Sequence, residues 1–87
     1  MSRVRQERCL VMLYFFHIKD EGDTIHDTEG RDFADLAAAR AEAIESAREL
    51  MSQRLLNEGR LGAGRVFEIT DERGCTVLTV PFQDALN

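Results

Sequence analysis

The clearest pattern in the chain is the strict alternation of apolar and polar residues near its C-terminus. It covers residues 67–70 of a predicted strand at residues 66–70 and recurs, slightly weakened, over residues 76–82. Such alternation is typical of strands that bury one face. The four residues between the two stretches end in Gly74, which suits the positive-φ position that often closes a hairpin loop. We therefore predict a β-hairpin here, followed by a fraying tail over residues 83–87.

Residues 11–18 break this rule, because they are apolar on both alternating faces of a strand. One face would carry Tyr14, Phe16 and Ile18, and the other would carry Leu13, Phe15 and His17. We assign the Phe16 side to the core, because His17 is the more polar choice for an outward face. Turn-forming residues 20–23 then reverse the chain into a short strand over residues 24–27, and residues 28–31 end that strand.

Between the two hairpins, the spacing of apolar residues predicts one long helix from Asp35 to about Glu58. Asp32 or Asp35 can cap its start with a side-chain oxygen, and Gly59 stands where a left-handed terminating residue is favoured. The apolar positions recur every three or four residues and so share one face. They are Leu36, Ala39, Ala43, Ile44, Ala47, Leu50, Met51 and Leu55.

Together these elements predict an α+β fold in the order β-β-α-β-β, a small antiparallel sheet with one long helix packed on one face. With 87 residues the chain is long enough for a single domain, in which residues 1–10 form a flexible extension. A sheet covered by one helix leaves its other face to water. Leu13 and Phe15, with Val11 and Val77 nearby, would form an exposed apolar patch of a size that monomers seldom leave open.

The length of the helix gives a second reason to expect a partner. A helix of about 24 residues is roughly 36 Å long, whereas a seven-residue strand spans about 23 Å. The last helical turns, with Leu55 and Leu56, should therefore overhang the sheet. We expect a homodimer, or another protein partner, at an interface formed by Leu13, Phe15, His17, Val77, Leu55 and Leu56. The alternative is that the N-terminal arm folds back over the patch.

The charge and cysteine content limit the possible partners and the cellular location of the protein. A formal net charge of −5 makes nucleic acid a poor partner. The apolar run at residues 9–16 is far shorter than the roughly 20 residues of a membrane-spanning helix, and no small-residue cleavage site follows it. Two cysteines without metal or redox spacing do not make a disulfide framework. We expect a cytoplasmic protein without a membrane segment.

The chain shows no pattern typical of a catalytic site. His17 and His26 lie near several acidic residues, but their spacing matches no metal-ligand pattern. The glycines after Gly59 follow a helix instead of opening one, so they do not form the usual phosphate-binding loop. We therefore predict no catalytic residue, metal or cofactor and no enzymatic activity. A metal-binding or small-ligand module that uses the two histidines is an alternative.

Four segments of the chain together resemble a family of short bacterial proteins classed only as a domain of unknown function. They are Tyr14-Phe-Phe-His17, Asp35-Leu-Ala-Ala-Ala-Arg-Ala-Glu-Ala43, Phe67-Glu-Ile-Thr-Asp-Glu-Arg-Gly74 and Val77-Leu-Thr-Val-Pro-Phe82. The resemblance covers about residues 12–86 and implies a family without an activity. Members of that family typically begin just before the first segment, which implies that Met12 is the start and that residues 1–11 are either an extension or the result of a misplaced start codon.

The order of two strands and an acidic, alanine-rich helix is also similar to the partial ribonuclease-H-like domain of HicB-type antitoxins. Those acidic proteins neutralise small basic toxins, but they carry a proline- and glycine-containing segment where this chain has residues 28–33. Three functions are therefore expected, in this order. They are a non-enzymatic homodimeric protein-interaction module, an antitoxin-like protein that binds a small basic toxin, and the small-ligand or metal-binding module.

Overall fold

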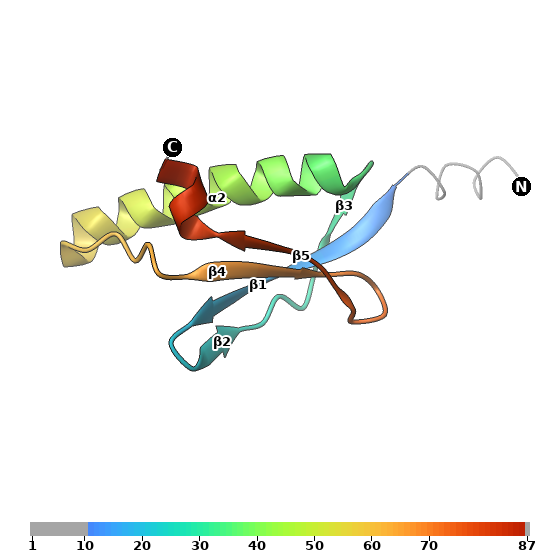
Figure 1. Ribbon diagram of the computed structural model, residues 1–87, viewed down its shortest axis with the longest axis horizontal. Coiled ribbons are helices and arrows are strands. Elements are labelled where there is room, and N and C mark those ends of the chain that lie inside the picture. The colour runs from blue at the N-terminus through green and yellow to red at the C-terminus, as the bar shows by residue number, and fades with distance from the viewer. Residues whose placement is uncertain (1–10, 87) are drawn as a thin grey trace, which may run out of the picture.

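A computed structural model of the protein describes residues 11–86, which form one antiparallel sheet and one long helix. This α+β architecture confirms the predicted fold class, with one strand more than expected. Helix α2 runs along one face of the sheet, and the C-terminal turn η1 lies beside it (Figure 1). The elements are β1 (Met12–Asp20), β2 (Asp23–Ile25), β3 (Arg31–Phe33), α2 (Leu36–Glu58), β4 (Val66–Thr70), β5 (Thr76–Pro81) and η1 (Phe82–Leu86).

Strand β1 lies inside the sheet, whose order is β2-β1-β4-β5. In its register with β4, Phe16 pairs with Ile69 and Ile18 pairs with Phe67. These four side chains all belong to the core or pack against it, as the assignment of Phe16 to the helix side predicts. The β4–β5 pairing has a register irregularity next to Thr70, of the kind that a β-bulge produces.

The additional strand is β3, and it changes the path of the chain before the helix. β2 pairs with residues 18–20 of β1 and β3 pairs with residues 12–14, so the chain returns to β1 after an excursion over residues 26–30. The prediction that residues 28–31 lead directly towards the helix is wrong. Three residues with a single apolar side chain carry no detectable periodicity, and Phe33 is held in place by stacking on Phe16 at a centroid distance of 5.6 Å.

Helix α2 begins and ends as its sequence predicts. The Asp35 carboxylate accepts a hydrogen bond from the Ala38 N–H at 2.8 Å, and Gly59 ends the helix with a φ of 75°. The residues that the helix buries completely or nearly so are Ala39, Ala43, Ala47 and Met51. Three of these four are alanines spaced four apart, so the helix backbone can approach the sheet closely.

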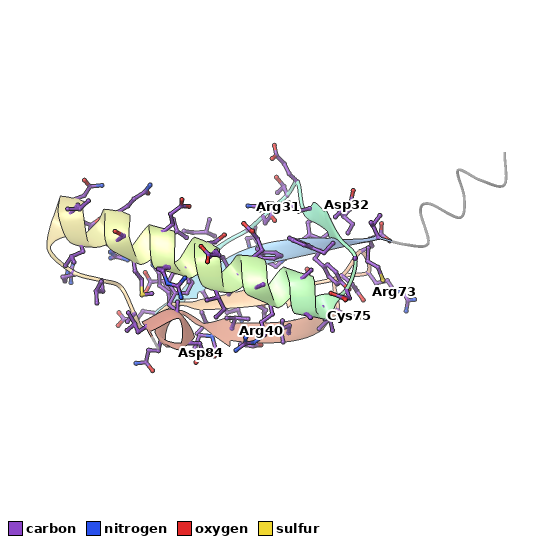
Figure 2. All side chains as sticks on the ribbon, turned by 90° about the horizontal axis from the view of Figure 1, so that it is seen from above. Arg31, Asp32, Arg40, Arg73, Cys75 and Asp84 are labelled. Atoms are coloured by element: carbon purple, nitrogen blue, oxygen red, sulfur yellow. The ribbon has the colours of Figure 1, made fainter. Side chains whose placement is uncertain are left out.

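The C-terminal segment is ordered by a buried anchor. Phe82 is fully buried, its N–H donates to the Arg65 carbonyl at 2.9 Å, and Ala85 is also buried. Arg40 and Asp84 form an ion pair of 3.8 Å between α2 and η1 (Figure 2). The expected fraying tail is therefore wrong for residues 83–86, because burial of Phe82 holds η1 against α2; residue 87 lies outside the described part of the chain.

Candidate functional site

On the outer face of β1, Leu13, Phe15 and His17 are half-buried, whereas Val11, just before the strand, is exposed by 41%. The 26–30 segment covers Leu13, Phe15 and His17 in part. A Cβ atom added to Gly30 would lie 3.0 Å from both Leu13 Cδ1 and Phe15 Cε2, which shows how closely this segment approaches β1. The prediction that Leu13 and Phe15 are exposed on a single chain is therefore wrong, because the return of the chain to β1 through residues 26–30 and β3 was not predicted.

The other predicted interface residues fall into two groups. Val77 is half-buried and packs against the core, on account of the irregular register of β5. Leu55 and Leu56 are exposed by 47% and 83%, so the last turns of α2 are open on this chain as expected. The structure brings these residues into no common patch with His17. The N-terminal arm that was expected as an alternative cover lies outside the described residues.

Asp27 organises the gap between β2 and β3. Its Oδ2 accepts a hydrogen bond from the Phe16 N–H at 3.0 Å, at a point of β1 that pairs with neither strand. Its Oδ1 accepts from the N–H groups of Glu29 and Gly30, each at 3.1 Å. A side-chain carboxylate thus replaces the backbone partner that β1 lacks here, since buried backbone donors are almost always paired.

These hydrogen bonds also set the charge of Asp27. Partial burial raises the pKa of its carboxyl, but hydrogen bonds from the backbone of Phe16, Gly30 and Glu29, together with the nearby His17, lower it by more. The net pKa lies below the usual aspartate value of 3.8. Asp27 is consequently an anion at physiological pH.

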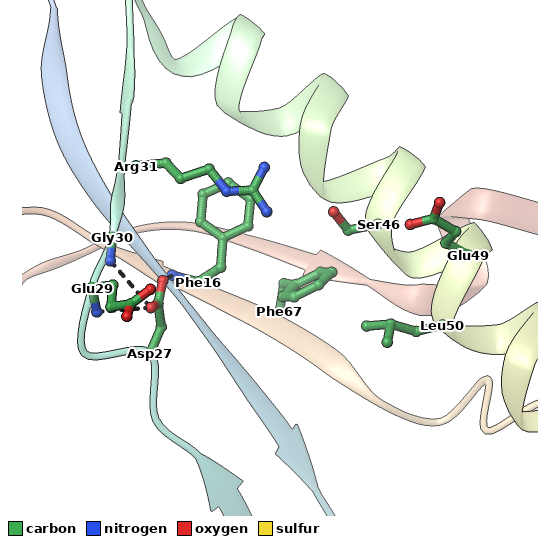
Figure 3. A pocket seen from close by; sticks show the side chains of 9 residues that line it. All are labelled: Phe16, Asp27, Glu29, Gly30, Arg31, Ser46, Glu49, Leu50 and Phe67. Carbon is green, nitrogen blue, oxygen red and sulfur yellow. Dashed lines mark hydrogen bonds between the residues drawn. The ribbon is translucent and has the colours of Figure 1, made fainter.

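A groove opens beside Asp27, between the edge of β1 and helix α2 (Figure 3). Its volume is about 430 Å³, which is within the range of ligand-binding pockets. The floor is apolar and consists of Phe16, Phe67 and Leu50; the two phenyl rings meet edge to face at 5.6 Å. The rim is polar and consists of Asp27, Glu29, Gly30, Arg31, Ser46 and Glu49.

The rim of the groove is acidic. Its three carboxylates are those of Asp27, Glu29 and Glu49, and within residues 11–86 neither glutamate forms an ion pair. The cation of the rim, Arg31, lies 2.7 Å from the carboxylate of Glu42 and is neutralised by it. Ser46 donates to the same carboxylate at 3.2 Å. Within the described part of the chain, the groove therefore combines an apolar floor with negative charge that no ion pair neutralises.

The described residues offer two further negative findings. No group of three or more histidine, cysteine, aspartate or glutamate side chains converges within residues 11–86 to hold a metal ion, although the rings of His17 and His26 lie 5.5 Å apart. In the same part of the chain, the single long helix falls short of the apolar character that a bilayer-crossing helix needs.

Residues 13–83 match a protein family described as "Domain of unknown function (DUF6894)". The chain belongs to this family. The match spans most of the sequence and confirms the resemblance to a domain of unknown function. No curated protein and no solved structure matches the chain. Membership of the DUF6894 family carries no activity with it, so the function must be argued from the geometry of this chain.

Sequence reasoning missed most of the groove. One local signal was available, since an aspartate followed by Gly30 three residues later is typical of a side-chain-supported turn, and Asp27 forms one. Glu29 and Glu49 carry no signal of their own. Both line the groove, from opposite sides, only because the chain returns to β1 through residues 26–30 and β3.

Proposed function

We propose that this DUF6894 protein is a non-enzymatic interaction module that binds a basic segment of another protein in the groove beside Asp27. The observation that carries this proposal is the combination of an apolar floor with carboxylates that have no cationic partner among residues 11–86. The proposed location is the cytoplasm, in keeping with a chain of two cysteines that have no disulfide spacing.

A lysine or arginine side chain has the two parts that such a groove selects. Its methylene stem packs on apolar surface while its charged end stays at the polar rim. Here the stem would lie on Phe16, Phe67 and Leu50, and the cation would face Glu29 and Glu49. An arginine can add a contact with an aromatic ring face, worth about 0.5–1 kcal/mol at an exposed site.

The same chemistry favours a basic partner over an acidic or neutral one. An anionic segment would meet three carboxylates and one neutralised arginine, Arg31. Electrostatic complementarity of this kind mainly sets specificity and the rate of association. One such basic partner would be a small basic toxin, as in HicB-type antitoxins. In that case a short basic protein should be encoded next to this chain.

A peptide titration with matched charge variants tests the proposal. A fluorescent peptide rich in lysine, arginine and leucine should bind the full chain, and a peptide with glutamate in place of the basic residues should not. Glu49→Lys should weaken binding by roughly tenfold, because it reverses a charge at the rim. Glu45→Lys is the control, since Glu45 is exposed on the same helix outside the groove. Equal loss in both variants, or equal affinity for both peptides, would contradict the proposal.

A second observation favours self-association at the end of α2. Leu55, Leu56 and the following Leu61 are exposed by 47%, 83% and 36%. We infer a homodimer that covers this end of the helix, in a two-fold arrangement because that is the commonest closed symmetry. The proposed interface has moved relative to the sequence-based expectation, which also included Leu13 and Phe15.

A further inference from the structure

The imidazole ring of His17 is held at both of its nitrogens. Nδ1 accepts a hydrogen bond from the Asp27 N–H at 3.1 Å, and Nε2 lies 3.0 Å from the hydroxyl oxygen of Thr70, which is buried. A backbone N–H can only donate, so Nδ1 must carry a lone pair. In the neutral ring the proton therefore sits on Nε2 and is donated to Thr70.

The two hydrogen bonds respond differently when the ring takes up a proton. A doubly protonated imidazole is a donor at both nitrogens. Its Nε2–H can still donate to the Thr70 hydroxyl, but its Nδ1–H would point at the Asp27 N–H, and two donors repel. Protonation therefore breaks one specific contact, the hydrogen bond from the Asp27 N–H to His17, while the bond from the Phe16 N–H to the Asp27 carboxylate is not affected.

We propose that His17 is a pH-sensitive latch, which holds the 26–30 segment against β1 when neutral and loosens it when protonated. Histidine is the side chain whose ordinary titration lies between pH 5 and 8. The latch acts on the groove because Asp27, Glu29 and Gly30 line it, so this part of the inference rests on the proposed function. Loosening the rim and adding a positive charge near it both weaken binding of a basic segment.

The titratable groups beside the ring are the Asp27 carboxyl group and His26, whose ring centroid is 5.5 Å away. Glu68 is the register partner of His17 on β4 and forms an ion pair of 3.5 Å with Lys19. On β1 itself, Phe15 stacks nearly parallel to the ring, at 8°. The carboxylate bonds of Asp27 persist in both states, so the segment loosens without leaving β1.

Amide hydrogen exchange on the free, full-length protein tests the latch. We expect the protection of the Asp27 amide, corrected for intrinsic rates, to fall about tenfold between pH 7.5 and pH 5.5, as loss of one hydrogen bond implies. His17→Asn should abolish this dependence, because asparagine offers an acceptor oxygen near the position of Nδ1 and does not titrate. His26→Asn is the matched control, because His26 is the other of the 2 histidines in the chain. This variant should keep the pH dependence of the wild type.

Three results would overturn the latch. They are an Asp27 protection that does not change with pH in the wild type, a pH dependence that His26→Asn removes, and imidazole ¹⁵N shifts that place the neutral proton of His17 on Nδ1. The last measurement needs no variant and therefore does not depend on the folding of His17→Asn.

The coupling to the groove has its own readout. The affinity for a basic peptide should fall several-fold from pH 7.5 to pH 5.5 in the wild type and in His26→Asn, and stay level in His17→Asn. If the protection of the Asp27 amide changes with pH in the wild type but the affinity for the peptide does not, the latch is not coupled to the groove. If no basic peptide binds at any pH, the proposed function fails, while the amide measurement still decides on the latch.

Discussion

At the scale of single residues, Asp27 accepts hydrogen bonds from Phe16, Glu29 and Gly30 where β1 has no paired strand on that edge. Hydrogen bonds from backbone donors to a charged acceptor contribute more than neutral ones. One carboxylate thus fixes the position of the 26–30 segment, and with it the β-side rim of the groove.

The lowered pKa of Asp27 makes this contribution pH-dependent. Because the folded-state pKa is lower than in the unfolded chain, the ionised group adds stability above about pH 3.8, and this stability is lost as the pH falls through the folded-state pKa. Asp27→Asn should lower the free energy of unfolding by about 1–2 kcal/mol at pH 7. Urea titrations should show the gap to wild type closing well below pH 3.8.

Asp23→Asn is the control for this prediction, because Asp23 is an exposed aspartate of the neighbouring strand β2. It should leave the free energy of unfolding nearly unchanged at both pH values. A gap for Asp27→Asn that is as large in acid as at neutral pH would show that shape, and not charge, explains the role of Asp27.

Gly30 combines a positive φ of 73° with a close approach to Leu13 and Phe15. Gly30→Ala should destabilise the protein by about 2–4 kcal/mol, the sum of left-handed backbone strain and overpacking. Gly22→Ala separates the two causes, because Gly22 has a φ of 89° and no atom within 4 Å of the added Cβ. It should cost only about 1–2 kcal/mol in the same urea titration. Equal losses would mean that the approach of Gly30 to Leu13 and Phe15 is immaterial.

At the scale of elements, the parts that the sequence predicts well are those with long periodic patterns. The bounds of α2 follow from apolar spacing, the Asp35 cap and Gly59, and β4 follows from strict alternation. The strand β3 could not be predicted in this way, because Arg31–Phe33 is too short to show a period. Its pairing depends on the Phe33 side chain meeting Phe16, a tertiary contact that no local pattern encodes.

The buried alanines of α2 allow the helix to pack closely on the sheet, and this packing can be tested by substitution. Ala43 is fully buried, whereas Ala41 on the same helix is exposed. Ala43→Leu should destabilise the fold by about 1–3 kcal/mol, because the larger side chain must push the helix from the sheet. Ala41→Leu should change the free energy of unfolding by less than about 0.5 kcal/mol. Comparable thermal midpoints for the two variants would argue against close helix–sheet packing.

At the scale of the whole molecule, the groove arises where segments far apart in the sequence meet. Phe16 comes from β1, Glu29 from the 26–30 segment, Glu49 from α2 and Phe67 from β4 (Figure 3). The sequence predicts that α2 packs on the Phe16 face, but it does not predict that the 26–30 segment runs alongside that contact. The expected interface on the outer face of β1, which includes His17, stays a prediction, and the groove is a separate candidate site that the sequence does not indicate.

The exposed leucines at the end of α2 also bear on how two copies of the molecule associate. If the exposed end of α2 is a self-interface, the solution mass should be that of a dimer at tens of micromolar and fall towards the monomer over a hundredfold dilution. Leu56→Ser should shift this midpoint to higher protein concentration, because burial of a leucine side chain contributes about 1.5–3 kcal/mol. Ser52→Ala, an exposed change one turn earlier on α2, is the control. A monomer at every concentration would rule the dimer out.

Titration with a lysine- and arginine-rich peptide, followed by NMR, shows whether a basic segment binds in the groove beside Asp27. Amide shifts should concentrate at Phe16, Gly30, Ser46 and Leu50, which line the groove. The β4–β5 hairpin loop, with its acidic Asp71 and Glu72, serves as the internal control. Shifts that concentrate at this loop, or spread evenly over the acidic surface, would show that the groove is not the binding site.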